Sequence, residues 1–215
     1  MDEAAGGDEA SDLGDGRLRK DGELHSGGDA AYDEATNEAF HALRLGRLLD
    51  ILGTSLSLEA PLRLLDAGCG TGRFTRALTR WGHNVDGIDS SPSAVEGCRA
   101  EAVGPERYSV GEPAHWRSPH LYDGVLAMDV LLHLTEDEVW RRSVTNLASL
   151  VRLGGLLALA DHDAPPEHLD GAHHVVRVST DYTSLVLPLG FRYQGFVAYR
   201  FRDHPAGLHV LRRVA

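Results

Sequence analysis

The sequence predicts an α/β fold in which helices cover both faces of a mostly parallel β-sheet. Short apolar runs typical of buried strands alternate with longer segments whose apolar residues recur at helical spacing. The connections between these segments are short, and strands that are joined through helices lie parallel in one sheet. The last two expected strands have no long helix between them, so at least one of them is expected to run antiparallel.

Signals at the helix ends support the first three helices. Residues 32–52 carry leucine and phenylalanine at helical spacing and are followed by Gly53, and residues 74–81 end in the same way at a glycine. In the third helix, 92–102, Ser91 is the expected N-cap, and the proline after it occupies the first helical position.

Two further helices are expected in the second half of the chain. The pattern T-x-x-E at 135–138 is typical of a capping box and predicts a helix that runs through Leu150 and stops near the glycines at 154–155. Residues 182–188 are the last expected helix, which ends at Gly190.

Seven apolar runs bounded by turn residues predict the strands. The third of them has little apolar character and is the weakest. The expected strands are 62–65, 84–89, 108–111, 124–128, 156–160, 191–201 and 208–213. The last two are joined by a turn through 204–207, so they can pair directly with each other.

Composition and charge restrict the function classes. The chain has 215 residues, 42% of them hydrophobic, which suits one domain with a core. A net charge of −11 argues against sequence-independent nucleic-acid binding and against an anionic membrane surface as partner. We find no run of 18 apolar residues and no basic-then-apolar N-terminus, so neither a membrane span nor a signal peptide is expected. Two cysteines imply no disulfide framework and favour a reducing cytoplasm.

Residues 1–30 differ in composition from the rest of the chain. They carry nine acidic residues against three basic ones, and few apolar side chains larger than alanine. Such a segment buries too little surface to offset the entropy of ordering, so we expect a disordered acidic tail. Residues 31–215 are expected to form a single domain.

The stretch LLDAGCGTGRF, residues 64–74, places three glycines at alternate positions directly after an expected strand. Ligands of open parallel sheets bind beyond the carboxyl ends of the strands. Glycine lets a ligand approach the backbone closely, and the following helix directs free N–H groups to the same place. The spacing G-x-G-x-G differs from the dinucleotide fingerprint G-x-G-x-x-G. Asp66 would repel a pyrophosphate and attract an ammonium group, which favours an adenosyl ligand with an amino-acid end.

Four segments in order resemble the class I S-adenosylmethionine-dependent methyltransferases. LLDAGCGTGRF is similar to their first motif, and VDGIDSSPSAVE, residues 85–96, to the second, in which an acidic residue ends the second strand. YDGV at 122–125 resembles the step into the fourth strand, and LVRLGGLLALA at 150–160 the approach to the fifth. The resemblance covers about 62–160. It implies a Rossmann-like class I methyltransferase sandwich, with a mostly parallel seven-stranded sheet and an antiparallel C-terminal strand.

The resemblance also implies the cofactor, S-adenosyl-L-methionine, and its contacts. Asp66 and the backbone of 67–72 would hold the methionine end, and Asp89 would accept hydrogen bonds from both ribose hydroxyls. Ser90 would lie against adenine, and Glu112 takes the place of an aspartate that relatives often have near the adenine amino group. The expected cofactor contacts are Tyr32, Arg44, Asp66, Ala67, Gly68, Cys69, Gly70, Gly72, Asp89, Ser90, Glu112 and Met128.

The N-terminal part and the end of the fourth strand complete this site. Residues 31–55 are expected to form lid helices over the cofactor, with Tyr32 at their start. Arg44 either reaches the cofactor carboxylate, as an arginine on the corresponding helix does in some relatives, or is an exposed helix charge. Met128 and Asp129 should face the methionine part or the acceptor.

Several residues keep two interpretations. Asp86 is the alternative to Asp89 as the ribose acid, although strand alternation and the distance from the strand end favour Asp89. Trp116 either stacks on adenine or covers the sheet edge. Cys69 is expected to fill space in the loop rather than to act as a nucleophile. The glycines could also form a tight turn that binds no ligand.

Methyl transfer from a sulfonium is an in-line displacement, in which the enzyme positions donor and acceptor and excludes water. A general base is needed only if the acceptor must lose a proton. His133, just past the fourth strand, is a candidate base or a structural residue. After the fifth strand the candidates for a base, an acceptor contact or a metal ligand are Asp161, His162, Asp163 and His168. A solvated loop is the favoured interpretation there, no metal is predicted, and His173 and His174 are expected to be solvated. Residues 161–181 should supply most of the acceptor wall.

The sequence therefore predicts methyl transfer to an oxygen or nitrogen of a small-molecule acceptor, in specialised metabolism, by a monomer or homodimer. Enzymes that methylate nucleic-acid amino groups resemble one another in an Asp/Asn-Pro-Pro-aromatic motif after the fourth strand. Here that place reads MDVLLH, which disfavours nucleic acid as acceptor. A peptide or protein acceptor, and a non-catalytic cofactor-binding subunit, remain as alternatives.

Overall fold

Seven strands form one sheet in the order β3-β2-β1-β4-β5-β7-β6 in the computed structural model, which describes residues 32–163 and 174–215. The strands are β1 Arg63–Ala67, β2 Asn84–Asp89, β3 Arg107–Val110, β4 Tyr122–Ala127, β5 Val151–His162, β6 Phe191–Ala198 and β7 Ala206–Arg213. The pairs from β3 to β5 are parallel, and β7 runs antiparallel to both of its neighbours. The predicted fold class is thereby confirmed, and the expected tail at 1–30 lies outside the described residues.

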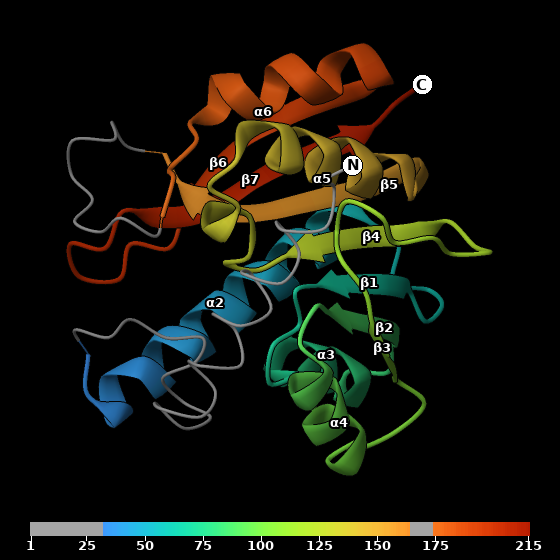
Figure 1. Cartoon of the computed structure of the whole chain (residues 1–215), viewed down its shortest axis with the longest axis vertical. Helices are drawn as coiled ribbons and strands as arrows, with labels where there is room; N and C mark the ends of the chain where they lie inside the picture. The colour runs from blue at the N-terminus through green and yellow to red at the C-terminus, as the bar shows by residue number, and fades with distance from the viewer. Residues whose placement is uncertain (1–31, 164–173) are drawn as a thin grey trace, which may run out of the picture.

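The helices are α2 Glu34–Ser55, α3 Arg73–Arg80, α4 Pro92–Ala100, α5 Asp137–Ser149 and α6 Ser179–Val186, with short 3-10 turns η1 Leu131–His133 and η3 Leu187–Leu189. Two apolar clusters lie on opposite faces of the sheet, one beneath α2 and α3 and the other beneath α5 and α6. Figure 1 shows this layered arrangement, with α5 and α6 together on one side. Among the described residues, none of the helices has the length and apolar character that crossing a membrane requires.

Neighbouring residues of the central strands point to opposite faces, which is why their sequences are apolar throughout. Leu64 belongs to the cluster beneath α2, whereas Leu65 belongs to the cluster beneath α5. Leu156 and Leu157 of β5 divide in the same way. A sheet buried on both faces requires such continuous apolar runs, and these runs allowed the strands to be located from the sequence.

Helix ends follow the predicted caps only in part. The Ser91 side chain accepts a hydrogen bond from the Ala94 N–H at 3.2 Å, which confirms this N-cap. The capping box predicted at 135–138 is wrong: α5 begins at Asp137, and its N-cap, Glu136, makes no side-chain capping bond. The 3-10 turn η1 ends at His133, and three residues separate it from α5. Gly53, expected to end the first helix, lies inside α2.

The glycines at 154–155 do not end α5 but lie within β5. The register of β5 against β4 jumps between Tyr122 and Gly124, which marks a bulge. Gly154 has a φ of +77°, and a Cβ on Gly155 would lie 2.8 Å from the carbonyl oxygen of Asp123. The glycines therefore permit a bulge in a strand that begins earlier than predicted.

The strand order reverses between β1 and β4, since the chain proceeds from β1 to β2 and β3 on one side and to β4 on the other. Open α/β sheets bind ligands beyond the carboxyl ends of the strands at such a switch point. Figure 1 shows α2 passing near the arrowheads of β1 and β4. The predicted site residues at the ends of β1, β2 and β4 therefore meet at one edge of the sheet.

Candidate functional site

The loop between β1 and α3 adopts a backbone that only glycine accommodates readily. Gly68, Gly70 and Gly72 have φ values of +75°, +51° and +76°. A Cβ on Gly68 would lie 2.5 Å from Cβ of Val130, and the Gly68 N–H donates to the carbonyl oxygen of Ile88 at 2.8 Å. The loop is thus held close to β2 and to the segment after β4, with its backbone accessible only because side chains are absent.

Asp66 lies fully buried near the end of β1, beneath this loop. Its Oδ2 accepts a hydrogen bond from the Thr75 hydroxyl at 2.6 Å. Its Oδ1 is buried and has no hydrogen-bond partner among the described residues. Burial raises the pKa of Asp66 to about 6, although the Thr75 bond acts in the opposite direction. A cationic group brought to Oδ1 would satisfy this oxygen and favour the ionised carboxylate.

Asp89 ends β2 beside the same loop. Its Oδ2 accepts from the Gly70 N–H at 2.8 Å and its Oδ1 accepts from the Ser91 N–H at 2.9 Å. The alternative acid, Asp86, instead accepts from the Tyr122 hydroxyl at 2.8 Å and pairs with Arg107. Asp89 is therefore the acidic residue of β2 at the glycine loop, and its carboxylate offers two acceptor oxygens, as a vicinal diol requires.

These features fit the cofactor that the sequence implies. A buried carboxylate oxygen that has no partner among the described residues suits an ammonium group, and the three glycines at positive φ keep the loop backbone free of side chains. The N–H groups at the start of α3 point toward this loop, as expected of a helix that begins at the edge of a binding crevice.

The other predicted cofactor residues differ in how far they are exposed. Cys69 is buried. A hydrogen bond with Cys98, together with this burial, raises the pKa of the Cys69 thiol. A thiol that stays protonated is a poor nucleophile, which agrees with the expected packing role. Ser90 is half-buried next to Asp89. The Glu112 carboxylate is exposed to a large extent and lies 3.0 Å from Nδ1 of His115. Ala67 is fully buried, and Met128 is nearly so and joins the cluster beneath α2.

Trp116 covers the backbone just after β3. A Cβ on Gly111 would lie 2.8 Å from the indole ring, and the ring packs against the cluster beneath α5 and α6. These contacts favour the interpretation in which Trp116 covers the sheet edge over the one in which it stacks on adenine.

Arg44 of α2 is not the exposed helix charge that was one of its two interpretations. Its side chain is 1% exposed and forms an ion pair and hydrogen bond with Oδ2 of Asp129. The guanidinium carbon lies 5.2 Å from the ring centroids of Phe40 and Phe74 and 5.6 Å from that of Tyr199. Phe40 lies one turn away on the same helix, whereas Phe74 and Tyr199 come from distant parts of the chain, so only the folded structure explains the burial.

The two members of the ion pair differ in burial, so we expect their removal to destabilise the protein by different amounts. Asp129→Asn should destabilise the protein by about 2 kcal/mol, because Arg44 would keep a buried charge without its anion. Arg44→Met should cost less, since the Asp129 side chain is 30% exposed and can be hydrated. Chemical denaturation of both variants measures the difference, and equal or reversed losses would contradict it.

The candidate bases lie at the ends of two neighbouring strands. His133 is in η1 after β4, with its ring edge-on to His174 at 4.6 Å between centroids. His162 ends β5, with its ring 5.4 Å from that of His204. Among residues 32–163 and 174–215, three or more possible metal ligands do not gather at any point. His168 and His173 lie outside the described residues.

Asp161 was expected in a solvated loop, and this is wrong. It is 1% exposed within β5, accepts a hydrogen bond from the Tyr182 hydroxyl, and its burial raises its pKa to about 6. Its neighbour Asp163 is exposed and accepts from the Ser179 N–H at 2.9 Å. Asp161 therefore acts as a buried link between β5 and α6.

Tyr32 packs in an aromatic cluster at the start of α2. Its ring lies 6.1 Å from Phe40, 5.6 Å from Phe201 and 6.1 Å from His204. Residues 34–55 form the single helix α2, whose inner face is part of the core. The lid role of 31–55 stays a prediction.

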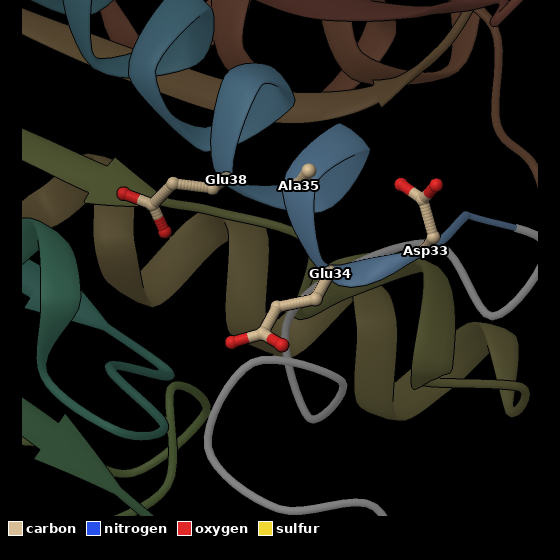
Figure 2. A pocket seen from close by; sticks show the side chains of 4 residues that line it. All are labelled: Asp33, Glu34, Ala35 and Glu38. Carbon is tan, nitrogen blue, oxygen red and sulfur yellow. The ribbon is translucent and has the colours of Figure 1, made fainter.

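An open pocket of about 610 Å³ lies at the first turn of α2 and is lined by Asp33, Glu34, Ala35 and Glu38. Figure 2 shows the Asp33 carboxylate directed away from those of Glu34 and Glu38. Asp33 is the N-cap of α2 and accepts from the Thr36 N–H at 2.8 Å. The acidic side chains therefore do not converge on one point in this pocket.

Sequence reasoning missed His41, which is 6% exposed on the inner face of α2. A signal for it exists: His41, Arg44, Leu48 and Ile51 recur at spacings of three, four and three, so two polar residues occupy an otherwise apolar stripe.

Comparison with known proteins agrees with this geometry. Residues 64–155 match the family model described as a methyltransferase domain. An O-methyltransferase named resE from Aspergillus sclerotiorum is 26% identical over 186 residues, which cover 80% of this chain and 69% of that protein. A ubiquinone biosynthesis O-methyltransferase from Xanthomonas campestris is 28% identical over 170 residues, with 76% and 67% covered.

Solved structures share the fold. A magnesium protoporphyrin IX methyltransferase from Synechocystis with bound S-adenosylmethionine superposes with a TM-score of 0.75 at 20% identity, covering 99% of this chain and 100% of that one. A 1,6-didemethyltoxoflavin-N1-methyltransferase from Burkholderia thailandensis with bound S-adenosylhomocysteine gives a TM-score of 0.67 at 18% identity, covering 100% and 93%.

Proposed function

We propose that the chain is a class I S-adenosylmethionine-dependent methyltransferase, which transfers a methyl group from S-adenosyl-L-methionine to an oxygen or nitrogen of a small-molecule acceptor. The observation that carries this proposal is the pair of carboxylates at neighbouring strand ends, Asp66 and Asp89, on either side of the side-chain-free loop. The curated relatives named above methylate oxygen, and the toxoflavin enzyme methylates nitrogen by its name. A role in specialised metabolism stays a prediction.

In this proposal each residue of the crevice has a binding role. Asp66 meets the ammonium group, the loop N–H groups hold the carboxylate side, and Asp89 accepts from the ribose hydroxyls. Arg44 is placed to pair with the cofactor carboxylate in exchange for Asp129, since a guanidinium can bind a carboxylate with two parallel hydrogen bonds. Ser90 and Glu112 would contact the adenine.

The bound cofactor supplies an activated methyl group on a sulfonium. The lone pair of the acceptor forms the new bond to carbon while the carbon–sulfur bond breaks and its electron pair stays on sulfur. An acceptor O–H or N–H then gives up a proton. His133 and His162 lie at the ends of β4 and β5, where an acceptor would be bound, and either imidazole can receive that proton.

The decisive experiment uses S-adenosylmethionine with a tritiated methyl group, mixed with the purified protein and a fractionated metabolite extract. Label in a small-molecule fraction, together with S-adenosylhomocysteine formation, is the expected result. The Asp66→Asn protein is the control for label transfer that does not need the site. Label in peptide or protein fractions would replace the small-molecule acceptor by a macromolecular one. Tight cofactor binding without transfer to any fraction would favour a binding-only subunit.

A further inference from the structure

His41 is a buried polar side chain next to the candidate site that the proposed roles leave unused. It lies on α2 and is 6% exposed, and neither Nδ1 nor Nε2 has a hydrogen-bond partner among the described residues. Buried polar groups in native proteins are nearly always paired, because an unpaired one retains its full desolvation penalty. A bound ligand that supplies the missing partners would explain why this chain keeps a histidine here.

The surroundings of His41 place it at the loop side of the crevice. Its ring lies 6.4 Å, centroid to centroid, from the ring of Phe74, which follows the glycine loop in the first turn of α3. Arg44 is three residues further along α2, so the two side chains share a face of the helix. The charges that act on the imidazole are those of Arg44, Asp129, Arg73 and Glu38. His41 thus lies beside the Arg44–Asp129 ion pair, at the end of β4.

This neighbourhood matches a zwitterion. Arg44 offers a positive charge and Asp129 a negative one at the same place. Burial and the two arginines lower the pKa of His41 to about 4, so its ring is neutral at pH 7. A neutral imidazole has one N–H donor and one acceptor nitrogen, which are the complements of a carboxylate and an ammonium group.

We propose that His41 binds the α-amino-acid end of S-adenosylmethionine, together with Arg44. This inference rests on the proposed function and adds a contact that neither the glycine loop nor the strand-end acids supply. Its role is in binding, so it predicts lower affinity for every ligand that carries the amino-acid end. Ligands that contain only the adenosine part should be unaffected.

Two probes separate these parts of the cofactor. S-adenosylhomocysteine has the amino-acid end, whereas 5′-methylthioadenosine lacks it and keeps the adenosine and the sulfur. Calorimetry of the full chain with His41→Leu should show about tenfold weaker binding of S-adenosylhomocysteine, equivalent to about 1.4 kcal/mol, and unchanged binding of methylthioadenosine. His41→Gln, which can still donate and accept hydrogen bonds, should recover part of the loss.

Thermal unfolding of the empty proteins provides a second readout. His41→Leu should melt at the same temperature or higher, because it removes an unpaired buried polar group. His209→Leu is the matched control: His209 is fully buried, its Nε2 also lacks a partner among the described residues, and it packs against Tyr182 and Phe196. This control should leave S-adenosylhomocysteine binding unchanged.

Each outcome distinguishes this inference from the proposed function. If the wild-type chain binds neither probe, the proposed function fails. If the wild-type chain binds both probes and His41→Leu binds S-adenosylhomocysteine as tightly as the wild type, the role of His41 is overturned. Equal losses for both probes, or a lower melting temperature, would assign His41 a structural role and also overturn the inference.

Discussion

Replacement of Asp66 by asparagine is expected to weaken S-adenosylhomocysteine binding about 100-fold at pH 7.5, or about 3 kcal/mol. Asparagine has nearly the shape of aspartate and can still accept the bond from Thr75, so the fold should survive. The loss arises because the ammonium group would face a neutral amide rather than a carboxylate whose Oδ1 has no other partner among the described residues.

The pH dependence of cofactor binding is an independent test of the contact between Asp66 and the ammonium group. In the free protein its pKa is raised to about 6 by burial, and a bound cation would lower it. Cofactor binding should therefore release a proton near pH 6, and affinity should rise with pH until about pH 6 and then level off. Calorimetry in buffers of different ionisation enthalpy measures the released proton.

Asp161 provides the matched control for this pH effect. It is also buried at a strand end, and burial also raises its pKa to about 6, but its carboxylate is paired with Tyr182. In Asp161→Asn the affinity for S-adenosylhomocysteine should still rise with pH up to about pH 6. In Asp66→Asn this rise should be absent. A pH profile that survives in Asp66→Asn would contradict the contact between Asp66 and the ammonium group.

The sequence predicted those parts of the site that depend on neighbouring residues along the chain. The glycine loop follows β1 directly, and Asp89 ends β2 where alternation and strand length placed it. Both positions depend on strand ends that meet at one edge of a parallel sheet. Their location therefore needed no knowledge of side-chain packing.

The sequence did not predict the part that tertiary packing creates. Helical spacing placed Arg44 on α2 but not the rings of Phe74 and Tyr199 or the carboxylate of Asp129 around it. Asp129 itself has a φ of +59°, which a local pattern does not indicate for a residue other than glycine. The burial of Asp161 against Tyr182 likewise depends on α6, some twenty residues further along the chain.

Gly68→Ala is expected to destabilise the protein strongly. Alanine at a φ of +75° costs about 1 kcal/mol, and its Cβ would lie 2.5 Å from both Cβ and Cγ2 of Val130. Relief of this overlap requires the loop or the segment after β4 to move, so the total loss of stability should reach about 3 kcal/mol. Cofactor binding should be lost as well, because the same backbone forms the glycine loop.

Alanine at two other glycines separates the cost of the positive φ from the cost of the steric overlap in Gly68→Ala. Gly70 has a φ of +51°, but a Cβ added there would meet nothing within 4 Å, so Gly70→Ala should cost only about 1 kcal/mol. Gly97 lies in α4 with equally open surroundings and no positive φ, so Gly97→Ala should stabilise the protein by about 0.5 kcal/mol. Urea unfolding of the three variants should give this order.

A double-mutant cycle with Val130 identifies the overlap itself. Val130→Gly removes all three atoms that the new methyl group would meet, so Gly68→Ala should cost less in its presence than in the wild type. A coupling energy of about 1 to 2 kcal/mol is expected, because the strain at φ +75° remains while the steric overlap disappears. Additive losses would show that the positive φ alone requires glycine at this position, and that the contact between the loop and the segment after β4 does not fix the loop backbone.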